Sequence, residues 1–529
     1  MFGKHQSEAR FQASPWVVAL TVSIATFMEV MDTSIANVAL RHIAGSVAAD
    51  QSESTWVLTS YLVSNAIIVP ISGWIAAVMG RKRFYMTCVV VFTVSSFLCG
   101  IAPSLGFLLM CRVLQGIGGG GLAPSEQAIL TDTFSAEQRG LAFAFYGVTV
   151  VVAPAIGPAL GGWITDTFSW RWIFFINVPI GILSLFLTSL VVSDSAGAKR
   201  EHAEATRGGI KVDYIGFALV ALGLGCLQVF LDKGQEDDWL GSTMIVTFIV
   251  LSGIGIFGAI FWELFGTKNP IVDLPLFKDR SFLFTNVMMF ATLFILLATT
   301  QLLPQFVQQE LPYDATRAGL ILMPGGFAMM VLMPLVGYLV RKIQPKYMIL
   351  FGFVVSALAL HHLCDFEPGI SFKQIVLARM FQGVGFAFLF VPIQTLAYSN
   401  LPEGKSSKAS ALINMMRNLG GSVGISVGTT LLARRSQVHQ DRLVSHLTPT
   451  ALPFQQALHR MGQHFSQFGL DAIDARHRAL ATISSEMQRQ ATMISYLDIF
   501  YVFMIGSLIA AGLTLFLKRM DLSKGGAHG

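Results

Sequence analysis

Fourteen long stretches of apolar residues alternate with polar segments along the chain. The hydrocarbon core of a bilayer is about 30 Å thick, and an α-helix of about 20 apolar residues spans it. The pattern therefore predicts fourteen transmembrane helices, and an even number places both termini on one side of the membrane. The expected ranges are 15–38, 55–76, 84–102, 107–128, 141–164, 172–192, 213–231, 241–263, 282–304, 318–340, 346–364, 373–396, 410–433 and 495–517.

The positive charges indicate which side holds the termini. If the termini are inside, the inner segments contain 21 of the 36 Lys and Arg residues. Cytoplasmic loops are enriched in these residues, so we expect cytoplasmic termini. The outer loop 434–494 carries seven Arg, but loops of that length translocate largely regardless of charge. The short outer loops contain only Arg41, Arg171, Lys233, Arg317 and Lys373.

Composition agrees with a membrane protein. Hydrophobic residues make up 53% of the chain and charged residues 13%, whereas soluble proteins contain about 25% charged residues. This excludes a soluble enzyme. The net charge of +5 is too small to indicate a nucleic-acid partner. The five Cys all lie within apolar stretches, so we expect neither disulfides nor a metal site. Gly118 to Gly121 lack the Lys-Ser or Lys-Thr of a nucleotide-binding loop, so we expect no cofactor.

The chain contains an internal repeat. Arg112-Val-Leu-Gln-Gly-Ile-Gly recurs as Arg379-Met-Phe-Gln-Gly-Val-Gly, 267 positions later. The two copies lie in spans four and twelve, so a six-plus-six duplication leaves two additional helices between its halves. Repeated halves are the usual architecture of a secondary transporter, with the substrate at their interface. The predicted domains are a six-helix bundle (1–192), a flexible cytoplasmic linker (193–212), two additional helices (213–263) and a second bundle (264–529) that contains the outer loop.

Charged residues within the spans are the strongest functional signal. Glu29 and Asp32 share one face of the first helix, and Arg112 lies at the depth of Asp32 in the fourth. Intramembrane charges are costly and usually functional. We therefore expect Asp32 and Arg112 to pair and protonation of Asp32 to release Arg112. A purely structural ion pair is the alternative.

Two further charges have weaker claims on the substrate cavity. Glu126 follows Arg112 by fourteen residues, so on one continuous helix it would lie about 21 Å further inward on nearly the same face. Together with Glu29 it would favour cationic cargo. The alternative is a residue whose carboxylate reaches water at the inner interface. Arg417 lies near the inner end of span thirteen, where packing or a salt bridge is the simpler explanation.

The fifth span is rich in Pro and Gly. Pro154, Gly157, Pro158, Gly161 and Gly162 fall within nine consecutive positions. Such a helix is expected to bend and to admit a neighbouring backbone closely. The segment is therefore a candidate hinge or seal between the two halves.

Several motifs together resemble the major facilitator superfamily, and specifically its fourteen-span drug/proton antiporters. The motifs are Asp32-Thr-Ser-Ile-Ala-Asn37, Gly73-Trp-Ile-Ala-Ala-Val-Met-Gly80-Arg81-Lys82-Arg83, the Arg112 motif, Gly157-Pro158-x-x-Gly161-Gly162 and Trp170-Arg-Trp. The resemblance implies a major facilitator fold, proton coupling at Asp32 and Arg112, and an inner gate at residues 73–83. It adds Asn37 and Gln115 to the cavity candidates. Glu29, on the face of Asp32, is the second candidate for the proton site. Ala77 stands where the family usually has Asp, and Glu29 and Glu126 where neutral residues are expected.

The long outer loop is similar to that of the EmrB group within the family. The resemblance implies proton-coupled efflux of hydrophobic drugs across the bacterial inner membrane, with an EmrA-like periplasmic adaptor and an outer-membrane channel as partners. A dedicated exporter of fatty acids or of a siderophore is the alternative. The stretch from Leu470 predicts an amphipathic helix with Leu470, Ile473, His477, Leu480 and Ile483 on one face. We expect the adaptor, or the transporter's own outer surface, to cover that face.

Overall fold

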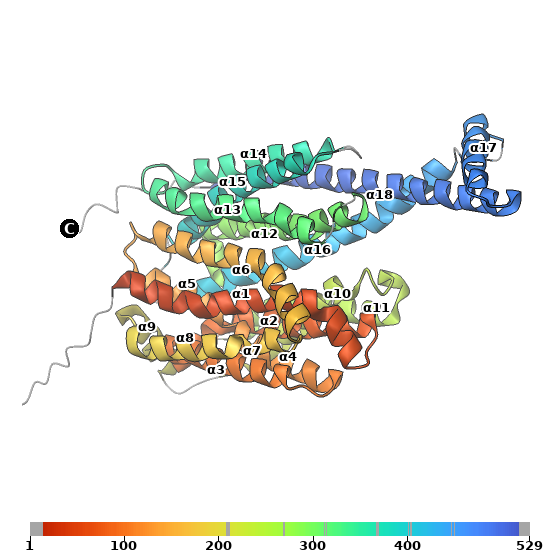
Figure 1. The fold of residues 1–529 in the computed structure, drawn as a ribbon. Helices are drawn as coiled ribbons and strands as arrows, with labels where there is room; N and C mark the ends of the chain where they lie inside the picture. Colours follow the sequence, from red (N-terminus) through yellow and green to blue (C-terminus); the bar gives the residue numbers. More distant parts are fainter. Residues whose placement is uncertain are drawn as a thin grey trace, which may run out of the picture.

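The computed structural model shows two bundles of helices lying side by side (Figure 1). It describes residues 14–207, 212–267, 270–311, 313, 315–366, 370–399, 401, 405–445, 447–448 and 450–517. All regular elements in this part are helical. The terminal residues 1–13 and 518–529 lie outside the described part.

The first bundle contains six spans, and two of them are each built from two consecutive helices. α4 ends within the glycine run 118–121 and α5 begins directly after it, because the run lacks side chains that would stabilise a continuous helix. The helices are α1 (Pro15–Ser46), α2 (Gln51–Met79), α3 (Arg81–Gly100), α4 (Leu105–Gly119), α5 (Leu122–Thr133), α6 (Arg139–Thr167), α7 (Trp172–Phe175) and α8 (Asn177–Val191).

Two additional helices and the second bundle follow. α10 and α11 pack against each other, and α10 also packs on α2. Their bounds are α10 (Tyr214–Lys233) and α11 (Thr243–Phe261), the latter continued by a π-helical turn (Trp262–Gly266). The second bundle consists of α12 (Arg280–Gln309), α13 (Ala315–Leu339), α14 (Pro345–Cys364), α15 (Phe372–Ala397), α16 (Ser406–Val444) and α18 (Ala472–Leu513), with α17 (Leu452–Gln467) in the outer loop.

Each of the fourteen predicted spans corresponds to a long helix or a broken pair of helices. Among the described residues, twelve helical segments are long and apolar enough to cross a membrane. The remaining two spans are α6, a continuous helix of 29 residues, and α16. α16 is polar because it lies between the bundles, where buried Ser406, Ser410 and Asn414 contact other helices rather than lipid.

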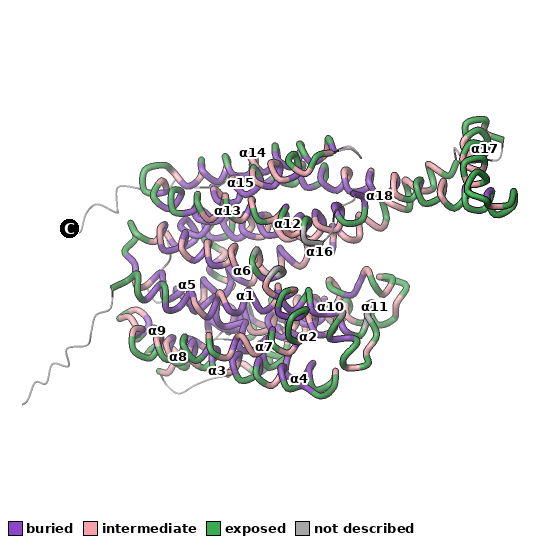
Figure 2. The backbone as a smooth tube through the Cα atoms, viewed as in Figure 1, coloured by how far each residue is buried: buried purple, intermediate pink, exposed green. Residues whose placement is uncertain are grey.

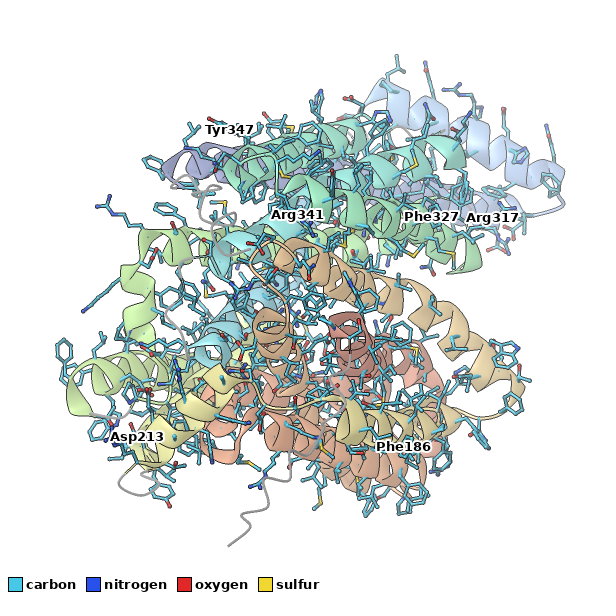
Figure 3. The ribbon with its side chains drawn as sticks, turned by 90° about the vertical axis from the view of Figure 1, so that its left-hand side faces the viewer. Phe186, Asp213, Arg317, Phe327, Arg341 and Tyr347 are labelled. Atoms are coloured by element: carbon cyan, nitrogen blue, oxygen red, sulfur yellow. The ribbon has the colours of Figure 1, made fainter. Side chains whose placement is uncertain are left out.

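The outward faces of the bundles are apolar. Phe186 on α8 and Phe327 on α13 are each more than 60% exposed, and both are labelled in Figure 3. Figure 2 shows the buried residues gathered inside the bundles and the exposed ones on their outer faces and at the loops. Large apolar side chains exposed along a helix that spans lipid contact the hydrocarbon. The exposed aromatic residues are therefore consistent with a membrane protein.

The predicted flexible linker contains a helix instead. α9 (Ala196–Thr206) is capped by Ser195, whose hydroxyl accepts a hydrogen bond from the Ala198 amide at 3.0 Å. Four alanines in eleven residues favour helix, which outweighs the charge and the glycine on which the prediction rested. α9 packs against the inner end of α2. α9 is therefore an ordered part of the inner surface.

The outer loop also differs from the prediction. Its amphipathic helix is not a separate element, because α18 runs without a break from the loop into the last span, and α16 likewise extends outward to Val444. The buried stripe of this extension is Ala475, Ala479 and Met487, whereas Ile473 is 68% exposed. Ile473 and Leu480 of the predicted face are both exposed, so the transporter's own surface does not cover them. α17 packs on α18, and this extension projects away from both bundles (Figure 1).

Candidate functional site

The two bundles meet at their inner ends. α2 packs on α16 and α6 packs on α13. A Cβ atom at Gly73 would lie 2.7 Å from the Ser407 carbonyl oxygen, so only glycine permits this approach of α2 to α16. Further inward-side contacts join Gln127 to the second bundle, where Asn414 and Tyr398 donate hydrogen bonds to its Oε1 at 2.7 and 3.2 Å. The inner side is therefore closed.

A cavity of about 430 Å³ lies between the bundles on the outer side of these contacts. It has the size of a typical pocket for a small organic molecule. Helices of both bundles line it, and so does Gln228 of α10. One additional helix thus contributes to the cavity wall, where Ser422 of α16 donates a hydrogen bond to Gln228 at 3.0 Å. Since the inner side is closed, the cavity has no opening toward the cytoplasm in this state.

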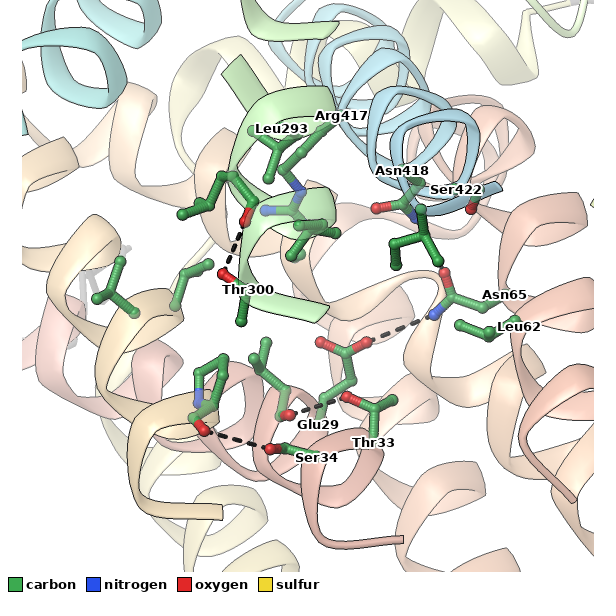
Figure 4. A pocket seen from close by; sticks show the side chains of 18 of the residues that line it. Glu29, Thr33, Ser34, Leu62, Asn65, Leu293, Thr300, Arg417, Asn418 and Ser422 are labelled. Carbon is green, nitrogen blue, oxygen red and sulfur yellow. Dashed lines mark hydrogen bonds between the residues drawn. The ribbon is translucent and has the colours of Figure 1, made fainter. Parts of the chain in front are cut away.

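Glu29 is the acid that faces this cavity. Figure 4 shows its carboxylate and the Arg417 guanidinium pointing into the same space from opposite walls. Tyr61 donates a hydrogen bond to Glu29 Oε1 at 2.9 Å, and Asn65 donates one to the same oxygen at 3.4 Å. Asn65 in turn accepts from Asn418 of the second bundle at 3.1 Å. Glu29 is therefore hydrogen-bonded into a network that reaches across the cleft.

Asp32 and Arg112 form an ion pair behind the cavity wall. Arg112 Nη1 lies 2.6 Å from Asp32 Oδ2, and both residues are buried. Gln115 and Asn177 donate hydrogen bonds to Asp32 Oδ1 at 2.9 and 2.7 Å. The guanidinium also lies over the ring of Tyr61, with its carbon 4.5 Å from the ring centroid. Tyr61 therefore connects the buried pair to the carboxylate of Glu29.

Two of the predicted cavity residues do not line it in this state. Gln115 is fully buried against Asp32 and Arg112 instead. Glu126 is also fully buried, with Ser23 donating a hydrogen bond to its Oε1 at 2.5 Å. The prediction for Glu126 assumed one continuous helix from Arg112, whereas the break between α4 and α5 changes the direction of every side chain beyond it. Burial also excludes a carboxylate that reaches interfacial water.

Three other candidates do line the cavity, namely Asn37, Pro154 and Arg417. Arg417 donates a hydrogen bond to the Tyr146 hydroxyl on α6. Two glycines of the Pro- and Gly-rich motif hold α6 against α1. A Cβ atom at Gly157 would lie 2.6 Å from Ser34 Oγ, and Gly161 faces Ile35 of the same helix.

Gly162 has only ordinary contact distance to Val38 of α1. The side chain of Pro158 lies outside the described part of the chain. α6 itself is helical throughout the motif.

The basic loop between α2 and α3 closes the inner side through Arg81. Gly80 has a φ of +86°, which favours glycine at this turn. Arg81 is buried, and its guanidinium contacts Asp132 at 2.5 Å, Glu201 at 2.7 Å and Ser407 at 3.0 Å. These partners come from α5, α9 and α16. Arg81 therefore joins both bundles and the connecting helix.

The other two basic residues of the loop make fewer contacts. The backbone amide of Lys82 donates a hydrogen bond to Asp194 at 2.9 Å, and its ammonium donates to the Ser189 carbonyl at 2.8 Å. Arg83 is exposed. The loop is thus held by its first two basic residues.

Glu201 provides an acidic partner for Arg81 at the closed inner side. Ala77 occupies the position at which the family usually has Asp, and Glu201 on α9 reaches the gate from the connecting helix. Burial raises the pKa of the Glu201 carboxyl above its ordinary value, although the Arg81 guanidinium opposes that shift. The free-energy cost of desolvating Glu201 therefore offsets much of the electrostatic attraction between Glu201 and Arg81. A contact of this kind can form and break during a transport cycle.

Replacing Glu201 by Gln should open the inner side more often, because Arg81 then loses one of its two acidic partners. Ser410 is fully buried between the bundles. Modification of a Ser410→Cys probe by a maleimide, in a background without the five native Cys, should become about tenfold faster, equivalent to about 1.4 kcal/mol. Glu204→Gln changes an exposed acid on the same helix and should leave the rate unchanged. Equal modification rates in the two variants would show that the contact between Glu201 and Arg81 does not hold the inner side closed.

Several site residues were absent from the sequence prediction. Tyr61 and Asn65 are uncharged and stand in no pattern that marks them, whereas Asn177 belongs to the motif that begins at Trp170 but was given no role. Arg379 had a signal, since it is the repeat copy of Arg112. Its location in the cavity wall follows only from the packing of α15.

A closed inner side, a central cavity between two repeated bundles and buried charges beside it define a membrane transporter. The family model for the Major Facilitator Superfamily matches residues 22–425, so the chain belongs to that superfamily. It is a multi-pass protein of the bacterial inner membrane, and a transporter of small molecules rather than an enzyme.

Known proteins resemble the chain over nearly its full length. The multidrug export protein EmrB of Haemophilus influenzae is 38% identical over 93% of each chain. The fatty acid resistance protein FarB of Neisseria gonorrhoeae is 36% identical over 98% of each. The solved structure of the proton:xylose symporter XylE aligns with a TM-score of 0.61 at 14% identity, covering 96% of this chain and 97% of that one, which shows the shared fold.

Proposed function

We propose that this transporter exports hydrophobic and amphipathic compounds in exchange for protons. The relatives named for multidrug export and for fatty acid resistance support the direction and the kind of cargo. The cavity supports the same reading, because apolar side chains such as Leu293, Leu322 and Phe386 form much of its wall. An apolar wall with few polar groups accepts many different molecules.

The main support for proton coupling is the chain of side-chain contacts that connects the cavity to the buried ion pair. Glu29 faces the cavity and accepts the hydrogen bond of Tyr61, whose ring lies under Arg112. Arg112 in turn pairs with Asp32. A proton that enters from the outside would meet Glu29 first and Asp32 behind it.

Protonation of Asp32 would change the packing of the first bundle. The neutral acid attracts Arg112 far less, and a buried guanidinium without its acid is costly. Arg112 and the helices that hold it, α1 and α4, would then favour another arrangement. In this account the outward-facing state binds the proton, and the inward-facing state releases it.

Glu126 is proposed as the inner site of the same pathway. It lies on α5, beyond the cavity floor formed by Ala123 and Pro124, and its Oε2 has no hydrogen-bond partner in the described part of the structure. An ionised carboxylate is costly to bury without hydrogen-bond donors for both oxygens. Opening of the inner side would expose Glu126 to the cytoplasm, where it could release a proton.

Everted membrane vesicles test this function directly. Vesicles with an acidic interior should accumulate a fluorescent hydrophobic dye, and a protonophore should abolish the accumulation. Vesicles from cells that lack the protein serve as the control. Accumulation that continues at its full rate after the proton gradient has collapsed would contradict proton exchange.

We further propose that the outer extension, residues 434–494, binds a periplasmic adaptor of the EmrA type, which leads to an outer-membrane channel. The extension projects beyond both bundles and carries exposed apolar side chains at its tip, including Leu452, Phe468 and Ile473. Exposed apolar residues on a part of the protein that lies outside the membrane indicate an interaction surface.

A further inference from the structure

The cavity carries more positive than negative charge. Its charged lining residues in the described part of the chain are Glu29, Arg379 and Arg417. The sequence pattern predicted the opposite, a cavity with two acids, but Glu126 lies outside it. A cavity with two guanidinium groups and one carboxylate favours an anion over a cation of the same size.

Arg379 is the copy of Arg112 in the second half, and the acid that should accompany it is absent. The repeat offset of 267 positions relates Arg112 to Arg379, Gln115 to Gln382 and Asp32 to Thr299. Thus the second half retains the arginine and the glutamine but has threonine in place of the aspartate.

The geometry of the second copy follows the first. Arg379 Nη1 donates hydrogen bonds to Gln382 Oε1 at 2.5 Å and to Thr299 Oγ1 at 3.2 Å, and Gln382 Nε2 also donates to Thr299 at 3.2 Å. Arg112 and Gln115 contact Asp32 in the same way in the first half. The difference is that the central acceptor in the second half is a neutral hydroxyl.

The charge of Arg379 is therefore uncompensated. Its side chain is 93% buried, with 7% exposed toward the cavity that it lines. Its other described bond is to the Thr300 hydroxyl, and no carboxylate of the described residues lies within ion-pair distance. Arginine remains charged in proteins. A buried charge without a counter-ion is costly, so this position indicates that an anion arrives from outside the chain.

The wall around Arg379 is apolar. Leu296 on α12, Leu322 and Met329 on α13 and Phe390 on α15 line the cavity from the same bundle. Gly325 and Gly383 allow α13 to pack closely on α15 here, since a Cβ atom at Gly325 would lie only 3.1 Å from Cγ of Arg379. A molecule with an anionic head and a hydrocarbon body would match both parts of this surface.

We propose that Arg379 binds the carboxylate of an amphipathic organic anion, such as a medium- or long-chain fatty acid, whose hydrocarbon part lies against this apolar wall. The inference rests on the proposed function, since it names a class of cargo for the same cavity. The planar guanidinium fits a carboxylate through two parallel hydrogen bonds, which adds geometric selectivity to the charge.

The location of Glu29 refines the coupling. An ionised Glu29 opposes an anion in the cavity, so at this residue proton and anionic cargo would bind together. Exchange requires that proton and cargo do not bind at the same time. That exclusion must then come from Asp32, which lies behind the cavity wall. Export of an anion against entry of a proton is also favoured by a membrane potential that is negative inside.

Binding of two probes of equal chain length tests the proposal. The full-length protein in lipid nanodiscs is titrated with radiolabelled dodecanoate and with dodecanol, at an alkaline pH that ionises the carboxylate. The wild type should bind dodecanoate more tightly than dodecanol. Arg379→Gln should lower the ratio of the two affinities roughly tenfold or more, the size expected for a lost charged hydrogen bond. Arg379→Lys should retain part of the preference, and Glu29→Gln should increase it.

Three results would overturn the proposal: no preference in the wild type, an unchanged ratio in Arg379→Gln, or no binding of either probe. Dye accumulation in everted vesicles, measured on the same protein, separates this inference from the proposed function. Proton-driven dye accumulation without a preference for dodecanoate overturns only the inference. A preference for dodecanoate without proton-driven accumulation overturns only the exchange with protons.

Discussion

Transport driven by a pH gradient should be abolished when Asp32 is replaced by Asn, while substrate binding stays measurable. Asn has nearly the shape of Asp and can still accept the hydrogen bonds that Gln115 and Asn177 donate to Oδ1. It cannot take up or release a proton. One carboxylate that moves its proton through 100 mV contributes about 2.3 kcal/mol, so loss of the coupling acid removes the driving force for concentration.

The measurement compares two activities of the same proteoliposomes. Accumulation under an imposed pH gradient should fall to the level of empty liposomes, whereas binding of labelled substrate should persist. Asp32→Glu keeps the charge beside Arg112 and should retain part of the accumulation. Gradient-driven accumulation at the wild-type rate in Asp32→Asn would refute the assignment. In that case Glu29→Gln and the double variant would show whether Glu29 is the coupling acid.

A loss of folding must be distinguished from a loss of coupling. Removing one partner of a buried ion pair typically costs about 3–5 kcal/mol, because the other charge remains without compensation. The double variant Asp32→Asn with Arg112→Gln removes both charges and should recover much of the thermal stability. It should not recover proton-driven transport. Recovery of both would assign the pair a structural role.

Drug resistance in cells should be lost when the tip of the outer extension is replaced, although transport by the isolated protein should be retained. The structure indicates where to cut. His439 on α16 contacts Asp498 on α18 at 2.8 Å, so a short Gly/Ser linker in place of residues 446–484 preserves the pairing of the two helices near the membrane. The replacement removes α17 and the exposed tip, including Phe468 and Ile473.

Two readouts separate the possible roles of the extension. If an adaptor binds there, the shortened protein should confer no resistance in cells but should accumulate dye in proteoliposomes at a rate near that of the wild type. A point variant, Ile473→Ser, should weaken resistance with little effect on folding, because the side chain is exposed. Full resistance in the shortened protein would exclude the extension as the docking site. Loss of dye accumulation in liposomes would show instead that the extension supports the transporter itself.

The sequence alone was sufficient for the course of the chain through the membrane. Apolar stretches of about twenty residues and the distribution of Lys and Arg depend on local composition and on the properties of the bilayer, so they predict spans and sidedness without any knowledge of packing. The repeat at Arg112 and Arg379 is likewise a property of the sequence. Depth in the membrane is nearly proportional to position along a helix, which is why Asp32 and Arg112 could be expected to meet.

The direction in which each side chain points was decided by tertiary structure. The break between α4 and α5 turns Glu126 away from the cavity, and the exposed and buried faces of α18 depend on how α17 packs against it. The contact between Glu201 and Arg81 requires an ordered connecting helix, α9, which depends on contacts with α2. The direction in which a side chain points from its helix has meaning only relative to the neighbouring helices. A single sequence does not specify those neighbours.

The net charge of the cavity depends on both the sequence and the tertiary structure. The sequence contains the loss of an acid from the second repeat, since Thr299 stands where Asp32 predicts an aspartate. Only the packing of α12, α13 and α15 shows that Arg379 then faces a space between the bundles. Composition and periodicity determine which segments enter the membrane, because lipid acts on each segment separately. The site arises from contacts among helices that lie far apart in the sequence, and those contacts exist only in the folded protein.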